Sequence, residues 1–299
     1  MQTIVAAFVG LAVAIGPVVA GEPVRVTRDG ARKLAPTFVD GGAGLVYAAH
    51  ERPNLVALVQ VSCPDGSKRE RVLPTVVNHQ FDPSFTGDGR YLAYSRTATS
   101  PQSLLVIRDR REQRESVFQP RNSRATVRYP SFSPDGSRVV FGLSDVGGQR
   151  IAAVDRSGRG LTILAASAGI NGWPSYAPDG RRIAFASSRD GDLDIYAMDA
   201  DGGRVSRLTR SPGRDIRPAW SPDGRRIAFT SARDGDEEIY LMEADGSNPR
   251  NLTRHRGRDT DPAWHPDGRW IALVSDRVGQ SEIYLMDVEP DRSAGSGPR

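Results

Sequence analysis

The order of apolar and polar positions follows one scheme that recurs along the chain. Within residues 218–254, four short apolar runs are separated by polar or Asp-Gly segments; the runs cover 218–220, 225–231, 238–244 and 249–253. Runs of this length, bounded by Gly, Asp and Pro, are typical of antiparallel β-strands joined by tight turns. No stretch after residue 20 has the period of an amphipathic helix. The pattern therefore predicts four strands per unit and an all-β fold.

The unit repeats at a nearly fixed period. The segment Pro-Ala-Trp-Ser-Pro-Asp-Gly has a counterpart in every unit, and the first prolines of these segments are Pro36, Pro83, Pro130, Pro174, Pro218 and Pro262. By subtraction, successive first prolines are 47, 47, 44, 44 and 44 residues apart. A period of this size indicates units that bury their faces only against one another, and four strands per unit are typical of a propeller blade. The sequence predicts a six-bladed β-propeller of four-stranded antiparallel blades.

Side-chain size alternates around each first proline. The second residue after it is always aromatic, namely Phe38, Phe85, Phe132, Tyr176, Trp220 and Trp264, and the residue between is small. Because the innermost strands of the blades crowd around the axis, a small side chain beside a large one suits the taper. We expect these aromatic residues to belong to the core.

The last unit lacks a fourth strand of its own. After the apolar run near residue 285 the chain continues into the Pro-, Gly- and Ser-rich segment 289–299, which we expect to be a flexible tail. Near the N-terminus, Pro-Val-Arg-Val-Thr-Arg at Pro23 matches Pro-Arg-Asn-Leu-Thr-Arg at Pro249. An open ring would leave an unsatisfied sheet edge. The sequence therefore predicts that an N-terminal strand closes the last blade.

Composition is that of one globular domain. Of the 299 residues, 38% are hydrophobic and 25% are charged, which is enough apolar material for a substantial core. Residues 1–20 carry no charge and end in Val-Val-Ala, the small-residue pattern of a signal-peptidase site. We expect cleavage after Ala20, export, and a propeller over 21–288; retention of the segment as a membrane anchor is the alternative. Cys63 is the only cysteine, and we expect an inert thiol.

The recurring Ser-Pro-Asp-Gly, Ile-Ala-Phe, Asp-Gly and Leu-Thr elements resemble the repeat of the TolB-like β-propeller family. The resemblance covers about residues 22–288 and is weaker in the first two units. It implies a periplasmic or secreted protein whose channel mouth receives partner segments. TolB itself has an additional α/β domain before its propeller; no segment here has that pattern, so we expect the propeller alone. The repeat also resembles propellers of prolyl-oligopeptidase-type peptidases, but the Gly-x-Ser-x-Gly elbow of their hydrolase domain is absent from the sequence.

The loops that differ between units should share one face. In a four-strand meander, the loops between strands two and three emerge beside the loops that join blades, and loops on a rigid scaffold tend to carry binding residues. The charged residues of these loops are Arg189, Asp190, Asp192, Arg233, Asp234, Asp236 and Glu237 farther out, and Arg214, Asp215, Arg217, Arg258, Asp259 and Asp261 nearer the axis. Such a collar would grip a polar, extended peptide. A solvated, self-neutralising rim is the alternative.

Other ligand classes have less support. The four histidines, His50, His79, His255 and His265, show no metal-site spacing, so we expect no bound metal or other cofactor. The run 190–194 resembles the start of a calcium loop, but the sixth and twelfth positions hold Ile195 and Asp201 instead of Gly and Glu; weak Ca²⁺ capture stays open. Forty basic and 36 acidic residues, interleaved, argue against a nucleic-acid surface.

The sequence favours an exported, monomeric, non-catalytic propeller that binds a protein or peptide partner at its channel mouth. The alternative is a propeller enzyme, a hydrolase or lyase acting on a glycan or small polar substrate through mouth carboxylates, with or without a divalent metal. Fold alone does not decide between them.

Overall fold

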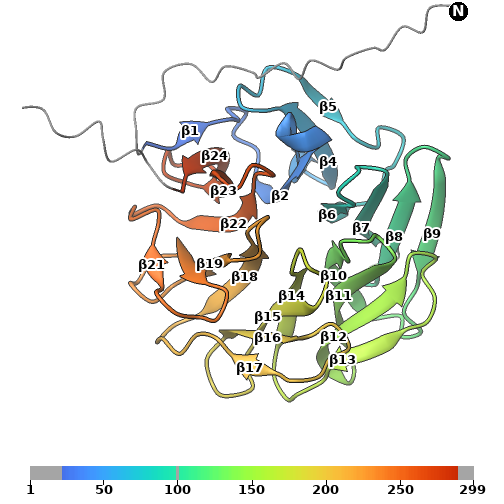
Figure 1. Cartoon of the computed structure of the whole chain (residues 1–299). Coiled ribbons are helices and arrows are strands. Elements are labelled where there is room, and N and C mark those ends of the chain that lie inside the picture. The colour runs from blue at the N-terminus through green and yellow to red at the C-terminus, as the bar shows by residue number, and fades with distance from the viewer. Residues whose placement is uncertain (1–21, 99–100, 289–299) are drawn as a thin grey trace, which may run out of the picture.

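Each unit of the repeat forms one four-stranded antiparallel sheet, and the six sheets form a ring (Figure 1). The computed structural model describes residues 22–98 and 101–288. The prediction of a six-bladed, all-β propeller is confirmed. The expected signal segment and C-terminal tail lie outside the described residues. Within the described ranges, no helix has the length and apolar character needed to cross a membrane.

The blades follow chain order. Blade 1 contains β2 (Lys33–Val39), the 3-10 helix η1 (Asp40–Gly42), β3 (Gly44–Arg52), β4 (Leu55–Ser62) and β5 (Arg69–Arg71). Blade 2 contains β6 (Gln80–Phe85), β7 (Tyr91–Thr97), β8 (Ser103–Asp109) and β9 (Arg114–Phe118). Blade 3 contains β10 (Thr126–Phe132), β11 (Arg138–Asp145), β12 (Gly148–Asp155) and β13 (Thr162–Ala165). Blade 4 contains β14 (Asn171–Tyr176), β15 (Arg182–Ser187), β16 (Asp194–Asp199) and β17 (Ser206–Arg207). Blade 5 contains β18 (Asp215–Trp220), β19 (Arg226–Ser231), β20 (Glu238–Glu243) and β21 (Arg250–Asn251). Blade 6 contains β22 (Asp259–Trp264), β23 (Trp270–Ser275), β24 (Glu282–Asp287) and β1 (Val24–Arg25).

The N-terminal strand closes the ring, as the sequence predicts. β1 pairs antiparallel with β24 and so becomes the fourth strand of blade 6. The threonine after it has the role of its counterpart in blade 5. Thr27 Oγ1 accepts the backbone N–H of Ile283 at 2.9 Å, and Thr253 Oγ1 accepts that of Ile239 at 3.1 Å. The match between these two segments therefore reflects one shared local structure.

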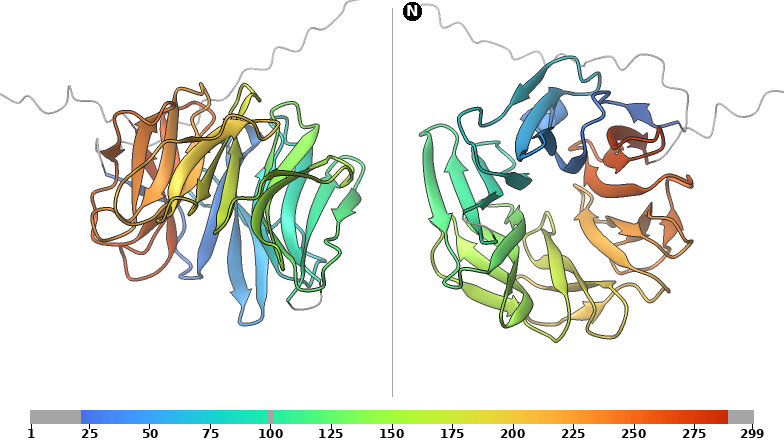
Figure 2. Two further views of the ribbon diagram at one scale, coloured as in Figure 1. Left: turned by 90° about the horizontal axis from the view of Figure 1, so that it is seen from below. Right: turned by 180° about the vertical axis from the view of Figure 1, so that it is seen from behind.

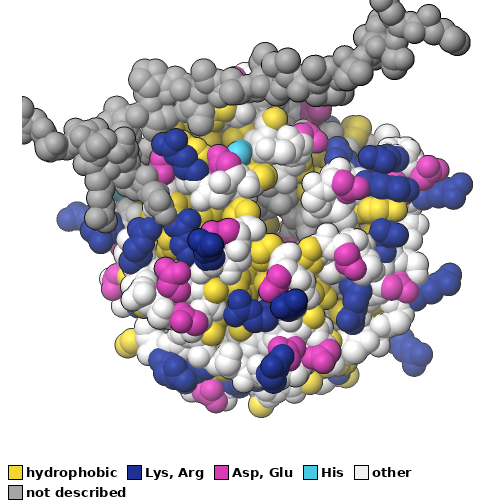
Figure 3. All heavy atoms as spheres, in the orientation of Figure 1, with side chains coloured by type: hydrophobic (Ala, Val, Ile, Leu, Met, Phe, Trp, Pro, Cys, Tyr) yellow, Lys and Arg dark blue, Asp and Glu magenta, His cyan; other side chains and the backbone are white. Residues whose placement is uncertain are grey.

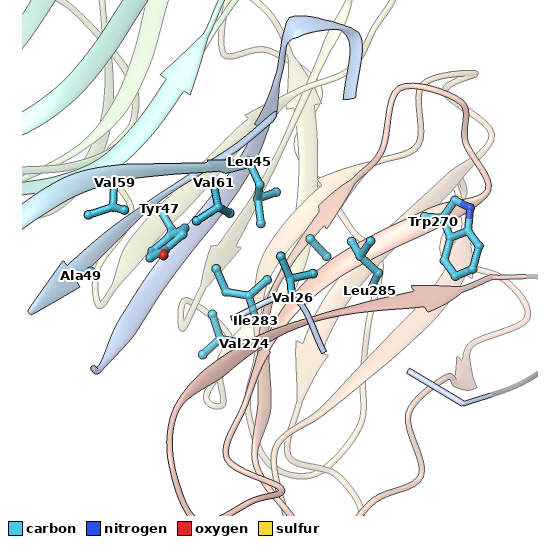
Figure 4. Packing of buried hydrophobic residues seen from close by; sticks show 11 residues of the cluster. Val26, Leu45, Tyr47, Ala49, Val59, Val61, Trp270, Val274, Ile283 and Leu285 are labelled. Atoms are coloured by element: carbon cyan, nitrogen blue, oxygen red, sulfur yellow. The ribbon is translucent and has the colours of Figure 1, made fainter. Parts of the chain in front are cut away.

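The hydrophobic core lies between blades. Six buried clusters are formed, and each draws its side chains from two neighbouring blades. Figure 4 shows the cluster at the closing seam, where Tyr47 of blade 1 faces Ile283 and Val274 of blade 6, with Val26 beside them. A single blade therefore buries its faces only against its two neighbours. Both views in Figure 2 show this ring, from the side and from behind.

The expected aromatic positions are part of this packing. Phe132, Tyr176, Trp220 and Trp264 are buried in the interblade clusters, and Phe38 and Phe85 are half-buried and pack against them. The prediction for these residues is confirmed.

Every innermost strand contains a β-bulge at its first proline. In β18 the register shifts between Ile216 and Ala219, so that two residues stand opposite one residue of β19. The innermost strands of the other five blades shift at the same place. The residue before the proline has a positive φ in all six blades: Ala35 (49°), Asp82 (53°), Tyr129 (56°), Trp173 (52°), Arg217 (58°) and Asp261 (57°). We call these six residues the pre-proline ring. Because every blade has the bulge, the strained backbone belongs to the scaffold, and it re-aims one side chain per blade.

Candidate functional site

The pre-proline ring lines the central channel. All six of its residues border one cavity of about 200 Å³, together with the prolines that follow them. The scaffold fixes the backbone at these positions six times over, whereas the side chains differ between blades. The channel wall is thus chemically asymmetric, although the backbone around it is repeated in every blade.

One side of the channel is aromatic. The rings of Tyr129 and Trp173 lie 5.2 Å apart, centroid to centroid, with 32° between their planes. The guanidinium groups of Arg128 and Arg217 lie 4.8 Å and 5.8 Å from the centroid of the Tyr129 ring. Arginine over an aromatic face is favourable and holds the guanidinium in a fixed plane. The wall therefore offers a flat apolar surface flanked by cations.

Two carboxylates in the channel wall are bound to arginine. Arg128 donates to Asp82 from Nε at 2.6 Å and from Nη2 at 3.1 Å, a two-pronged contact. Arg217 forms an ion pair with Asp261 of the next blade. Burial lowers the pKa of Arg217, while Tyr129 and Asp82 act in the opposite direction; the guanidinium stays charged at any ordinary pH. Both acids are almost fully buried.

A wider mouth opens above the ring. A second cavity, of about 580 Å³, shares Trp173, Arg217 and Asp261 with the channel and is bordered by the loops that join blades. At its rim the buried Glu237 carboxylate is shared by Arg214 and Arg258; Nε of Arg258 donates to it at 2.9 Å. The two arginine side chains are 51% and 62% exposed, so they can still donate to a ligand.

The thirteen residues of the expected collar fall into three groups. Five of them, Arg214, Arg217, Glu237, Arg258 and Asp261, border the mouth. The other eight are held elsewhere in the blades or lie at loop tips. The structure therefore brings together four of the six residues expected nearer the axis, with Glu237 from the outer set, and leaves the other eight outside the mouth lining.

Four of the eight belong to a contact that blades 4 to 6 repeat. In blade 5, Arg233 donates to Ser231 Oγ at 2.8 Å and to Asp215 Oδ2 at 2.9 Å, and its guanidinium lies 4.4 Å from the centroid of the Tyr240 ring. Arg189 with Asn171 in blade 4, and Arg277 with Asp259 in blade 6, occupy the same places. Asp215 and Asp259 have no exposed surface. Arg189, Arg233, Asp215 and Asp259 thus hold the second strand to the first.

The remaining four acids lie at the tips of two outer loops. Asp190 accepts a hydrogen bond from the Tyr196 hydroxyl at 2.6 Å, and Asp234 accepts one from Tyr240. Burial, with the adjacent carboxylate, raises the pKa of each of these tyrosines to about 12. The neighbouring Asp192 and Asp236 are exposed. None of these four acids belongs to the lining of the mouth cavity.

Sequence reasoning missed three channel residues, Asp82, Tyr129 and Trp173, and the Arg128 side chain that binds Asp82. A weak signal for the first three was present, since the residue before each first proline varies between units, being Ala, Asp, Tyr, Trp, Arg and Asp in chain order; the position before it varies as widely. What a sequence cannot show is the bulge that turns this residue into the channel.

Figure 3 draws the face opposite the mouth, where the turns between first and second strands lie; hydrophobic side chains surround its middle, and basic and acidic side chains are interspersed outside them. Across the part of the chain that the structure covers, no three His, Cys, Asp or Glu side chains lie close enough to hold a metal ion. Of the loop considered for Ca²⁺, Asp190 is bonded to Tyr196, and Asp194 is buried against Thr209 and Arg207.

Comparisons with known proteins agree with this architecture. A structure assigned as TolB from Agrobacterium tumefaciens is 25% identical, with a TM-score of 0.65 over 74% of this chain and 80% of that one. TolB from Acinetobacter baumannii is 23% identical, with a TM-score of 0.66 over 84% of this chain and 65% of that one. Oligogalacturonate lyase from Vibrio parahaemolyticus is 14% identical, with a TM-score of 0.58 over 89% and 93% of the two chains. The last two likenesses concern the fold alone.

A comparison with curated protein sequences gave no match. The sequence profile of the TolB beta propeller domain, in contrast, matches residues 43–215 and 209–294. These two segments cover all six first-proline units except the start of the first, and they contain the mouth residues of blades 4 to 6. With the repeat, the closed six-bladed ring and this match in agreement, the chain belongs to the TolB β-propeller family.

Proposed function

We propose that the chain is a binding protein that receives an extended segment of a partner protein at its channel mouth. The observation that carries the proposal is the pre-proline ring: a scaffold repeated six times projects non-repeating side chains into one channel. A purely structural channel has no need of such variety. Specificity carried by a few side chains on a rigid frame is the usual arrangement of a binding site.

The chemistry of the mouth suits a peptide. Tyr129 and Trp173 offer a flat surface for an apolar side chain, and the half-exposed Arg214 and Arg258 offer donors to carbonyl or carboxylate oxygens. An extended peptide presents both kinds of group at short intervals. The wide mouth above the narrow channel would admit a chain end or a loop.

The state of the channel carboxylates favours binding over catalysis. Glycoside-cleaving sites use one carboxylic acid and one free carboxylate on either side of the bond. Here Asp82 and Asp261 each engage an arginine, which ties up both groups. The relatives that include a lyase are too distant in sequence to transfer an activity.

A photo-crosslinking experiment tests the proposal. A photoreactive amino acid is placed in the full chain at Gln280, an exposed residue of the mouth, or at Val205, an exposed residue outside the mouth lining, as the matched control. In extract of the source cells, we expect a protein adduct from position 280 only, and its loss when Trp173 is changed to Ala. Equal adducts from both positions, or an adduct that survives the Trp173→Ala change in a folded protein, would refute the proposal.

We also propose that the protein acts outside the cytoplasm, on the strength of the uncharged segment 1–20 and its small-residue end. Cell fractionation with mass spectrometry of the N-terminus tests this. An exported chain beginning at Gly21 is expected; an uncleaved cytoplasmic chain would contradict it.

A further inference from the structure

The turns between third and fourth strands close the gaps between blades. In four blades this turn contains a glycine that lies against the outer strand of the preceding blade. A Cβ atom on it would come within 2.1 Å of Val26 O at Gly66, 3.1 Å of Val117 C at Gly158, 2.7 Å of Leu164 O at Gly202 and 2.6 Å of Leu208 O at Gly246. At Gly66, Gly202 and Gly246 only a residue without a side chain permits this approach, and at Gly158 a Cβ would require the neighbouring backbone to shift. At these four interfaces the turn between the third and fourth strands therefore packs directly against the preceding blade and leaves no gap.

Blade 2 breaks the rule. Its turn between β8 and β9 runs from Arg110 to Gln113 and has no glycine; Glu112 stands where blade 5 has Gly246. Both turns begin alike, since Arg110 N–H donates to Arg90 O and Ala244 N–H donates to Arg225 O. Between this turn and β5 of blade 1 a groove of about 440 Å³ remains. The groove therefore follows from a local departure from the repeat.

The groove is rich in arginine. Its lining contains five arginines and two carboxylates. Two of the arginines are neutralised in place, because Arg90 donates to Asp109 at 2.7 Å and Arg108 to Glu115 at 3.0 Å. The other three, Arg71, Arg110 and Arg111, have no carboxylate within ion-pair distance among the residues that the structure describes. The two lining carboxylates, Glu70 and Asp88, have partners of their own in Lys68 and Thr86.

One donor in the groove has no acceptor. Nη2 of Arg71 donates to the carbonyl oxygen of Val76 at 2.9 Å, but its Nε is buried and meets no acceptor within the described part of the chain. Buried donors in folded proteins are nearly always paired, and an unpaired charged donor is costly. Arg110 is oriented by Gly89 O at 2.8 Å and by the face of Phe85, and Arg111 is exposed. The half-buried Arg110 and the exposed Arg111 thus present donors that an incoming anion can reach, beside the Arg71 guanidinium.

We propose that this groove between blades 1 and 2 binds an oxyanion group, a carboxylate or a phosphate, through Arg71, Arg110 and Arg111. Guanidinium groups suit both anions because their N–H donors match a pair of oxygens. The site is separate from the channel mouth, with which it shares no lining residue. The propeller then carries a second ligand on its rim, independent of any partner at the channel.

Isothermal titration of the full chain with citrate, and separately with inorganic phosphate, tests the proposal at constant ionic strength. The test variant is Arg111→Gln, because Arg111 is exposed and supports no packing. The matched control is Arg225→Gln, an exposed arginine of a turn in blade 5 that borders none of the cavities described here. We expect saturable binding of at least one anion, about tenfold weaker in Arg111→Gln and unchanged in Arg225→Gln.

A second variant tests the geometry and not only the charge. The double change Glu112→Gly and Gln113→Ser keeps Arg111, installs the Gly246 and Ser247 of the blade 5 turn, and should close the groove although it removes a negative charge. Loss of binding with an unchanged circular dichroism spectrum supports the proposal. Absence of saturable binding to either anion, or equal weakening by Arg225→Gln, would overturn it. Anion binding is compared only among variants whose melting temperature matches that of the native chain. A partly unfolded variant is then not mistaken for a protein that has lost the site.

Discussion

Lys33 and Glu282, from opposite ends of the chain, form an ion pair of 2.9 Å at the seam that closes the ring, and neither side chain has exposed surface. The Glu282 carboxylate also accepts hydrogen bonds from Arg25 at 3.0 Å and from the backbone N–H of Gly30 at 2.9 Å. Three segments of the N-terminal region thus converge on one acid of β24. Together with Thr27, these contacts fasten the first strand to the last blade.

The first prediction concerns this fastening. Changing Glu282 to Gln should lower the free energy of unfolding by about 3 kcal/mol, because breaking a buried ion pair leaves Lys33 without its full charge compensation. Urea denaturation of both proteins measures the change. The control is Glu243→Gln, an exposed acid in the equivalent strand of blade 5, for which a change within about 0.5 kcal/mol is expected. Similar values for the two variants would show that the seam does not depend on the pair.

The same residue should make stability depend on pH. Burial alone would raise the pKa of Glu282, but hydrogen bonds from Thr27 and Lys33 outweigh it and hold the pKa below its usual value. A carboxylate with a depressed folded pKa stabilises the protein above its unfolded pKa, about 4.3, and loses this contribution as the pH falls through the folded value. The stability difference between the native chain and Glu282→Gln should therefore be constant above about pH 6 and shrink below about pH 4. A difference that grows on acidification would contradict the assignment.

Structural features that rest on a repeated sequence motif can be predicted from the sequence alone. The blades, their strands and the closing role of β1 could be predicted, because each rests on a motif present several times, such as Thr27 matching Thr253. The site could be predicted only in part. Arg233 and Asp215 have the appearance of mouth residues in sequence, and only their mutual contact reveals a structural role. Trp173 was missed because the bulge that turns it inward is a backbone feature.

A third prediction uses Trp173 as a reporter of the channel. Trp220, Trp264 and Trp270 are buried at 7%, 9% and 6% exposure, whereas Trp173 is half-buried and borders the channel. Iodide, an anion drawn toward the arginines of the mouth, should quench a distinct fraction of the tryptophan fluorescence. That fraction should disappear in Trp173→Phe while the melting temperature is kept. Unchanged quenching in this variant would mean that the channel is closed to small anions.

The thiol of Cys63 should be unreactive in the folded protein. Burial, with a smaller effect of the Asp65 carboxylate, raises the pKa of Cys63 to about 12, so that almost no thiolate is present at neutral pH. Ellman's reagent at pH 8 is therefore expected to label the native protein far more slowly than the same protein in 6 M guanidinium chloride. Labelling at comparable rates would show that the segment around Cys63 opens readily.

The last prediction separates backbone strain from contact between blades. Gly246 and Gly235 both have a strongly positive φ, 90° and 110°, so alanine is strained at either position. The difference lies in their surroundings: a Cβ on Gly246 would meet Leu208 O of the preceding blade at 2.6 Å, whereas a Cβ on Gly235 would meet nothing within 4 Å. Gly246→Ala should therefore lower the free energy of unfolding by at least about 1 kcal/mol more than Gly235→Ala, because overpacking adds to the strain. Urea denaturation of the two variants decides the point. Equal losses would mean that the turn is free to move away from its neighbour, and that the interblade seal deduced for this turn does not hold the blades together.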